Sequence, residues 1–367
     1  MKKIAGVILF LFSGVLFALQ PPAVNSVTAH FDKVKNDPEH LLLFLQDMPK
    51  GGDLHFHLGG SGMAENMIQY AANDNSLCID KNTFAISDNP NCTPDYLLNN
   101  SPKNSALYNQ IINAWSMRNF VAGPESSHDH FFATFGKFNA VSGKHSGEIL
   151  AEVMQRAFDQ NESYLELMVT PDSDASGMLG KKLGYNSDFK AMREKLLANG
   201  LDSIVADISK NMDLDEAKTK KILGCEPTAP LCKIKVRYLY QILREQPPEQ
   251  VFGQLLAGFE VASKDPRFVG INMVQPEDGF ISMRDYKLHM QMVGFLHDLY
   301  PNVHISLHAG ELNSTLVPYA GLQFHINDAV RVAHAERIGH GVDVAYEKNS
   351  AELLNDMAKN ISWLKLI

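Results

Sequence analysis

The sequence has no long block of like charge, no internal repeat and no low-complexity segment. Its 33 Lys and Arg residues and 42 Asp and Glu residues are scattered along 367 residues and leave a net charge of −9. Nucleic acids are bound largely through clustered positive charge, so this pattern excludes a nucleic-acid partner from our expectations. With 45% hydrophobic residues, the chain can bury a large core, and we expect one large domain.

Long hydrophobic runs are also scarce, since the only one covers residues 4–18. Lys2 and Lys3 precede this run, and Pro21 and Pro22 follow it. This order is typical of a secretory signal peptide, which we expect at residues 1–20, with residues 21–367 forming the mature domain. The run is short for a membrane-spanning helix, so a membrane anchor is the weaker alternative. We expect a secreted or periplasmic protein without membrane contact after cleavage.

Cysteine is rare, and its spacing excludes some kinds of site. The four cysteines form two close pairs, Cys78 with Cys92 and Cys225 with Cys232, and neither pair has Cys-x-x-Cys spacing. A zinc or redox role is therefore the weaker interpretation. An even number of cysteines after a signal peptide predicts two short-loop disulfides, with free thiols as the alternative.

Short apolar runs rich in β-branched residues alternate with helical patterns along the chain. This alternation predicts a parallel α/β architecture with long insertions after the first and second strands. The expected strands are residues 53–57, 164–170, 236–243, 268–274, 304–308, 337–342 and 361–367. The expected helices are residues 40–46, 131–141, 146–159, 188–198, 201–212, 215–223, 249–263, 283–299 and 324–335.

The segment MPKGGDLHFHLGGS, residues 48–61, carries two histidines on a predicted strand. His55 and His57 are two residues apart, so strand alternation points both rings to one face while Phe56 points to the other. On a barrel strand that face is the interior, where two neutral imidazoles can bind one metal ion. The alternative for this motif alone is two core or surface histidines.

Two later strands also end in histidine. SLHAGE, residues 306–311, places His308 and Glu311 at the end of one strand, and RIGHG, residues 337–341, places His340 at the end of the next. Barrel enzymes keep their active residues at these carboxyl ends. A site rich in histidine with an acid beside it indicates a zinc ion that activates water for attack on an electrophilic carbon.

The three blocks, in this order, resemble the adenosine deaminase family, most of all its secreted, growth-factor-related branch. HFFATFGK (130–137), YLELM (164–168) and FVGINMVQPED (268–278) are similar to further segments of that family. The resemblance covers roughly residues 37–344. It implies a (β/α)8 TIM-type barrel of the metal-dependent hydrolase (amidohydrolase) superfamily.

The resemblance also implies roles for individual residues. His55, His57 and His308 are expected to bind one Zn²⁺ ion, and His57 also lies beside the substrate. Glu311 is expected to protonate N1 of the purine, and His340 to orient the attacking hydroxide. The implied reaction converts adenosine or 2′-deoxyadenosine, a small-molecule purine nucleoside, to inosine or 2′-deoxyinosine and ammonia.

The sequence departs from the family pattern at three places. Gly59 stands where many members have an Asp that contacts the ribose, and Gln275 stands where a Gly usually faces the purine. The sequence contains no Asp-Asp pair, whose first member is a zinc ligand in the family. We therefore expect a C-terminally truncated, incomplete barrel of about seven strands, weak zinc binding and greatly reduced turnover.

Two other functions fit the same blocks. One is a metal-dependent hydrolase that acts on another amidine or amide, and the other is a non-catalytic secreted protein that binds nucleosides. Formation of inosine would favour an adenosine deaminase over the other hydrolase. Nucleoside binding without release of ammonia would identify the non-catalytic binding protein.

Overall fold

The computed structural model describes residues 22–71, 77–87, 92–226, 228–359 and 363–365. The chain divides into two compact units, Met1–Pro49 and Lys50–Ile367. The predicted signal peptide, residues 1–20, lies outside the described residues. The first unit contains helices α1 (Pro22–Val34) and α2 (Pro38–Asp47), and Asp37 caps α2 by accepting hydrogen bonds from its first backbone N–H groups.

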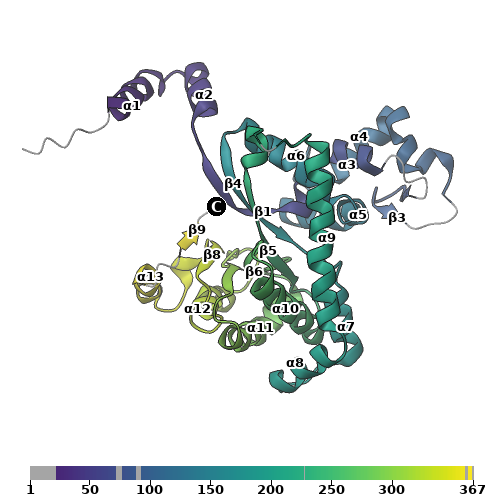
Figure 1. Cartoon of the computed structure of the whole chain (residues 1–367), viewed down its shortest axis with the longest axis vertical. Helices are drawn as coiled ribbons and strands as arrows, with labels where there is room; N and C mark the ends of the chain where they lie inside the picture. The colour runs from purple at the N-terminus through teal and green to yellow at the C-terminus, as the bar shows by residue number, and fades with distance from the viewer. Residues whose placement is uncertain (1–21, 72–76, 88–91, 227, 360–362, 366–367) are drawn as a thin grey trace, which may run out of the picture. The chain divides into compact units, whose positions relative to one another are not determined.

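The second unit is built around a seven-stranded parallel sheet in the order β1-β4-β5-β6-β7-β8-β9. The strands are β1 (Gly51–His57), β4 (Glu162–Val169), β5 (Lys235–Leu243), β6 (Phe268–Val274), β7 (His304–Ala309), β8 (Arg337–His340) and β9 (Trp363–Lys365). Each strand pairs with the next one along the sheet, and helices follow between them (Figure 1). This is the predicted α/β, TIM-type barrel with about seven strands.

Helices cover the outer face of the sheet because both faces of its central strands are apolar. The main core contains buried side chains of β4 to β8 together with those of the surrounding helices. α10 is buried along most of its length. The covering helices are α6 (Ser146–Asp159), α9 (Leu201–Ile222), α10 (Pro248–Lys264), α11 (Phe280–Leu299), α12 (His325–Arg331) and α13 (Ser350–Lys359).

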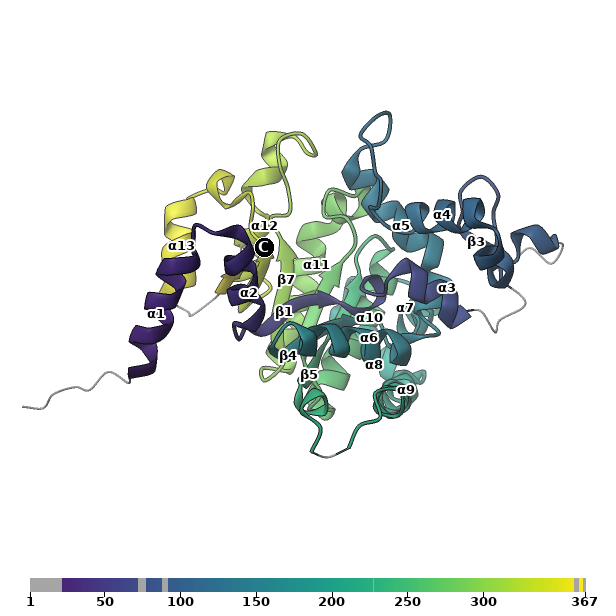
Figure 2. The ribbon, with the colours of Figure 1, turned by 90° about the horizontal axis from the view of Figure 1, so that it is seen from above.

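The two predicted insertions are present. The first, between β1 and β4, has a hydrophobic cluster of its own around Ile68, Ile111 and Trp115, and lies to one side of the barrel (Figure 2). It contains α3 (Ala64–Tyr70), β2 (Cys78–Ile79), β3 (Ile86–Ser87), α4 (Ser105–Ala114) and α5 (Ser127–Ser142). The second, between β4 and β5, contains α7 (Ala175–Leu183), α8 (Phe189–Ala198) and α9.

Each insertion carries one disulfide, Cys78–Cys92 in the first and Cys225–Cys232 in the second, as predicted. Among the described residues, no helix is both long enough and apolar enough to span a membrane.

Three sequence predictions were wrong in detail. The helices expected at 201–212 and 215–223 are one continuous helix, α9, because Asp213 and Leu214 do not interrupt its hydrogen bonding. The helix expected at 324–335 is only α12, because His334 adopts a positive φ of 58°. β8 ends at His340, whose φ is 70°, so residues 341 and 342 do not continue the strand. Of the strand expected at 361–367, only β9 lies within the described residues.

Candidate metal centre

Three imidazoles from two strands converge at the carboxyl edge of the sheet. His55 and His57 lie on β1 and His308 lies on β7, and each offers one nitrogen within 4.8 Å of the others. The Nε2 atoms of His57 and His308 are 3.2 Å apart. Phe56, between the two β1 histidines, packs against the main hydrophobic core. The alternation expected of β1 therefore holds, and the three rings form a group suited to a borderline metal ion.

Hydrogen bonds to the far nitrogens orient two of these rings. Nδ1 of His308 lies 2.7 Å from Oδ1 of Asn272, and the backbone N–H of His308 donates to the same oxygen. Because a backbone N–H can only donate, that oxygen accepts, so Nδ1 of His308 carries the proton and Nε2 is free to bind metal. Nδ1 of His57 lies 3.4 Å from Oε1 of Gln241, which makes a longer contact of the same kind. Such outer hydrogen bonds are typical of metal-binding histidines.

A glycine on β8 makes room for the third ring. A Cβ atom at Gly339 would lie 2.7 Å from Cε1 of His55, so any side chain there would displace the imidazole. The next residue, His340, holds its ring centroid 5.2 Å from that of His55 and 5.1 Å from that of His308. His340 adopts a positive φ, and residues other than glycine hold this conformation only where their surroundings impose it.

The surroundings of His57 and His308 favour the neutral forms of these two side chains by lowering their pKa. Burial lowers the pKa of His57, the hydrogen bond with Gln241 opposes this, and His340 lowers the pKa further. Burial, followed by the charges of His57 and His55, lowers the pKa of His308 well below its usual value. A neutral imidazole is the form that binds metal, so these shifts fit the proposed ligands.

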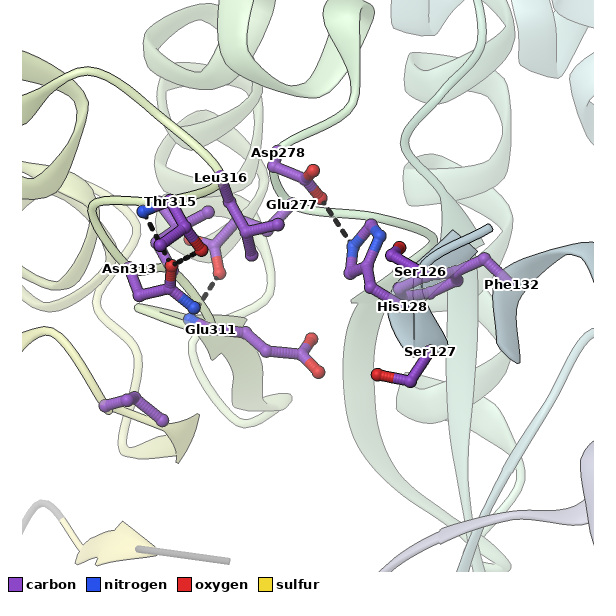
Figure 3. Close-up of a pocket in the computed structure, with 12 residues that line it drawn as sticks. Ser126, Ser127, His128, Phe132, Glu277, Asp278, Glu311, Asn313, Thr315 and Leu316 are labelled. Atoms are coloured by element: carbon purple, nitrogen blue, oxygen red, sulfur yellow. Dashed lines mark hydrogen bonds and ion pairs between the residues drawn. The ribbon is translucent and has the colours of Figure 1, made fainter. Parts of the chain in front are cut away.

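Glu311 lies between this centre and a cavity of about 420 Å³. Its Oε2 atom is 3.5 Å from Nε2 of His340. Its carboxylate points across the cavity toward Ser127 at the start of α5 (Figure 3). Burial raises the pKa of Glu311, and the charge of His340 opposes the increase. The cavity has the size of a small-ligand site, and Glu311 can both hold and deliver a proton there.

The backbone that carries Glu311 is held by a buried ion pair. Glu277 accepts hydrogen bonds from the N–H groups of Gly310 (2.9 Å) and Glu311 (2.7 Å). Its Oε1 atom also lies 2.6 Å from Nδ1 of His325, and both side chains are fully buried. The ring of Tyr286 stacks on His325 with 3.7 Å between centroids. The Gly310–Glu311 turn is therefore fixed by residues outside the metal centre.

A second contact joins the two sides of the cavity. His128, in the first turn of α5, lies 3.1 Å from Oδ1 of Asp278, which follows β6 (Figure 3). Burial acts to lower the pKa of His128, but its hydrogen bonds and the nearby charges of Asp129 and Asp278 raise it overall. α5 therefore contacts the opposite side of the cavity at this position through a charged pair.

The structure brings together all five residues predicted from sequence: His55, His57, His308, Glu311 and His340. The sequence prediction did not assign Asn272, Gln241, Glu277 or His325. Asn272 and Glu277 lie in the FVGINMVQPED segment, where inward alternation along β6 was the available signal for Asn272. His325 had no local signal, because its partner is 48 residues away.

The two positions that depart from the family pattern lie outside the cavity lining. Gln275 has a φ of 81°, a conformation that favours glycine, which agrees with the residue expected there. Its Oε1 accepts from the backbone N–H of Glu245 at 2.7 Å, and its backbone carbonyl accepts from Arg244. Gly59 is exposed and lies in the short 3-10 helix Leu58–Gly60 that follows β1. Neither residue is among those that line the cavity.

The chain is similar to known proteins in sequence and in fold. A family model described as adenosine deaminase matches residues 94–363, a span that includes His308, Glu311 and His340 and begins after His55 and His57. No curated protein matches. A zinc-bound amidohydrolase from Burkholderia ambifaria is similar at 16% identity and a TM-score of 0.52 over 87% of this chain.

The chain covers 65% of that amidohydrolase, which is less than two thirds of its length. An adenine deaminase from Arthrobacter aurescens is 15% identical with a TM-score of 0.45, over 83% of this chain and 68% of its own. At 16% identity the amidohydrolase supports the fold alone, and the family model supports the relationship in sequence.

Proposed function

The chain belongs to the adenosine deaminase family, and from this premise we propose that it is a zinc-dependent deaminase of purine nucleosides. The reaction consumes adenosine or 2′-deoxyadenosine and water and releases inosine or 2′-deoxyinosine and ammonia. The observation that carries the proposal is the convergence of His55, His57 and His308 beside Glu311 at one edge of the sheet.

The donor set fits zinc. Three imidazoles are a known catalytic ligand set for this ion, and two of these three have outer hydrogen bonds. A bound zinc ion supplies Lewis-acid activation of water near neutral pH. The ligands themselves are held by Asn272, Gln241 and the space left at Gly339, so little rearrangement is needed to bind the ion.

Glu311 and His340 supply the proton chemistry of the proposed reaction. Burial favours the protonated form of Glu311, which can donate its proton to N1 of the purine and make C6 more electrophilic. His340 lies 3.5 Å from Glu311 and beside the metal ligands, where it orients the water that attacks C6. The amino group then leaves C6 as ammonia.

The cavity supports a ligand of nucleoside size. Ser127, His128 and Asp278 line it together with Glu311, so polar groups face the side away from the metal centre. In the proposed complex, the sugar contacts these polar groups while the base lies over Glu311. Because Gln275 and Gly59 lie outside the lining, substrate choice rests on the lining residues rather than on these two positions.

The deciding experiment measures conversion of adenosine by the zinc-loaded chain. Slow loss of the adenosine absorbance band, with inosine identified by chromatography, is the expected result, because this sequence contains no Asp-Asp pair. His308→Ala and Glu311→Gln should each abolish it. His304→Ala is the matched control, because His304 lies at the exposed opposite end of β7.

Other outcomes identify the alternatives. Binding of adenosine in calorimetry, without release of ammonia, would indicate a nucleoside-binding protein rather than an enzyme. Release of ammonia from another cyclic amidine, with no reaction of adenosine, would support a hydrolase activity but reject a nucleoside as its substrate.

We also propose that the protein is secreted. Two disulfides and a basic, then apolar N-terminal sequence support an oxidising compartment. N-terminal sequencing of the protein from the culture medium should find a start near residues 19–24. Full-length protein retained inside the cell would contradict the proposal.

A further inference from the structure

A second group of potential metal ligands lies at the other end of the sheet. His297 is in the last turn of α11, Asp298 follows it, and His334 lies in the segment between α12 and β8. The ligand atoms of these three residues are all within 4.8 Å of one another. The two imidazoles stack with their centroids 4.6 Å apart and an angle of 21° between their planes.

A close backbone approach brings the two histidines together. A Cβ atom at Gly294 would lie only 2.4 Å from the carbonyl oxygen of Val332, so α11 touches the segment after α12 at a point where only glycine fits. Gly294 and His297 are three residues apart and share one face of the helix. His334 is two residues beyond Val332 and has a φ of 58°, which turns the chain at this point.

One ring nitrogen of this group, Nδ1 of His297, is buried without a hydrogen-bond partner among the described residues. Its closest acid is Asp298, at 4.0 Å. A buried ring nitrogen without a partner is costly unless water or an ion supplies one. Asp298 and His334 are exposed, so an ion can reach the group from solvent.

We propose that His297, His334 and Asp298 bind a second divalent transition-metal ion, with zinc as the probe ion. Two imidazoles and one carboxylate suit such an ion, and water can complete its coordination. The group lies before the start of β8, whereas His340 lies at its end. Three residue steps of about 3.3 Å separate Arg337 from His340, so the two centres are at least roughly 10 Å apart along this strand.

The test counts zinc ions per chain. The full chain is stripped with a chelator and titrated with zinc alone by calorimetry, and the bound metal is measured by elemental analysis. We expect two ions per wild-type chain and one per chain in His334→Ala and in His297→Ala. Because each variant lacks a direct ligand, its second dissociation constant should increase by more than about 100-fold. His308→Ala should also hold one ion, namely the one bound by His297 and His334.

The matched control is His304→Ala, which removes an exposed histidine that pairs with Glu336 at 2.7 Å. This variant should keep two ions. A single ion in wild type that is lost in His334→Ala but kept in His308→Ala would support the second metal site and reject the first. Equal zinc counts in wild type, His297→Ala and His334→Ala would overturn the proposal, and so would loss of an ion in His304→Ala.

A spectroscopic measurement separates ligand loss from general loss of structure. Cu²⁺ added to the variant His55→Ala/His57→Ala/His308→Ala, which lacks every ligand of the first centre, should give an electron paramagnetic resonance spectrum with coupling to two imidazole nitrogens. The same variant with His334→Ala added should show coupling to at most one. An unchanged spectrum after His334→Ala is added would overturn the assignment of His334.

Discussion

Glu277 allows the most direct test of how the Gly310–Glu311 turn is held. Its carboxylate is fully buried and accepts from Gly310 and Glu311 while it pairs with His325. Burial alone would raise the pKa of Glu277, but the hydrogen bond and charge of His325, followed by Arg244, lower it below 4.5. The side chain is therefore a buried anion whose stability depends on these partners.

Glu277→Gln keeps the shape of the side chain but replaces one acceptor oxygen with an N–H donor. Each oxygen of Glu277 accepts from a backbone N–H of the turn, so the new donor must face one of these N–H groups, and that hydrogen bond becomes a repulsive contact. Removing one partner of a buried ion pair typically costs about 3–5 kcal/mol. We expect Glu277→Gln to lower the free energy of unfolding by at least about 3 kcal/mol and to reduce kcat.

The assay is urea unfolding of the metal-free protein at pH 7, followed by circular dichroism. Glu336→Gln is the matched control, since Glu336 forms the same kind of pair with His304 but both side chains are more than half exposed. Exposed pairs contribute at most about 1 kcal/mol. A loss in Glu277→Gln no larger than in Glu336→Gln would refute the reasoning.

The pH dependence gives an independent check on Glu277. A carboxyl whose pKa is lowered by folding stabilises the protein above its usual pKa, and this contribution is lost as the pH falls from 4.5 through the lowered value. Wild type should therefore lose stability in this range more steeply than Glu277→Gln. Parallel curves for the two proteins would show that the anion contributes nothing.

Three further predictions concern the metal centre and its surroundings. Asn272→Ala removes the acceptor that orients His308, so zinc affinity should fall by about 10–100-fold in calorimetry; unchanged affinity would contradict the orienting role. Gly339→Ala places a Cβ atom 2.7 Å from the ring of His55, so zinc affinity should fall while the far-ultraviolet circular dichroism spectrum stays unchanged. An unchanged zinc affinity would show that the ring can move aside. Burial, followed by the charges of Glu277 and Glu347, raises the pKa of Asp343 from 3.8 to about 7. Folding therefore favours the protonated carboxyl, and wild type should lose up to about 4 kcal/mol of stability as the pH rises from 4 through 7, whereas Asp343→Asn should not. Identical pH profiles of the two proteins in urea unfolding would reject this prediction.

The parts of the site that follow from local pattern could be predicted from the sequence. Alternation along β1 determines that His55 and His57 share a face, and the parallel α/β order determines that His308 and His340 lie at the same edge. Both inferences require only the position of each strand in the sequence and its direction in the sheet. They were correct because each histidine lies at or near the last residue of its strand.

The supporting residues could not be predicted in the same way. Glu277 meets His325 across 48 residues, and Asn272 meets His308 across 36, so each partnership depends on the packed fold. α12 is shorter than its apolar pattern predicts because the chain turns at His334, and the close contact at Gly294 was not visible locally. Long-range contacts of this kind determine where local patterns end.

The metal centre and the curvature of the sheet depend on each other. β1 lies at one end of the sheet, and four strands separate it from β8. The ring of His55 nevertheless lies 5.2 Å from that of His340 and fills the space left by Gly339. Two strands so far apart in the sheet can meet only if the sheet curls into a barrel.

The centre therefore joins parts of the sheet that are not hydrogen-bonded to one another. His55 and His57 come from β1, the first strand of the sheet, and His308 comes from β7, the fifth, so an ion bound to all three would link these two strands. A ligand that binds only the folded state stabilises it by about 2.7 kcal/mol at 100 times its dissociation constant. In this fold that free energy would stabilise the curved form of the sheet, because only the curved sheet brings the three ligands together. The ion that would activate water would thus also stabilise the strand arrangement that binds it.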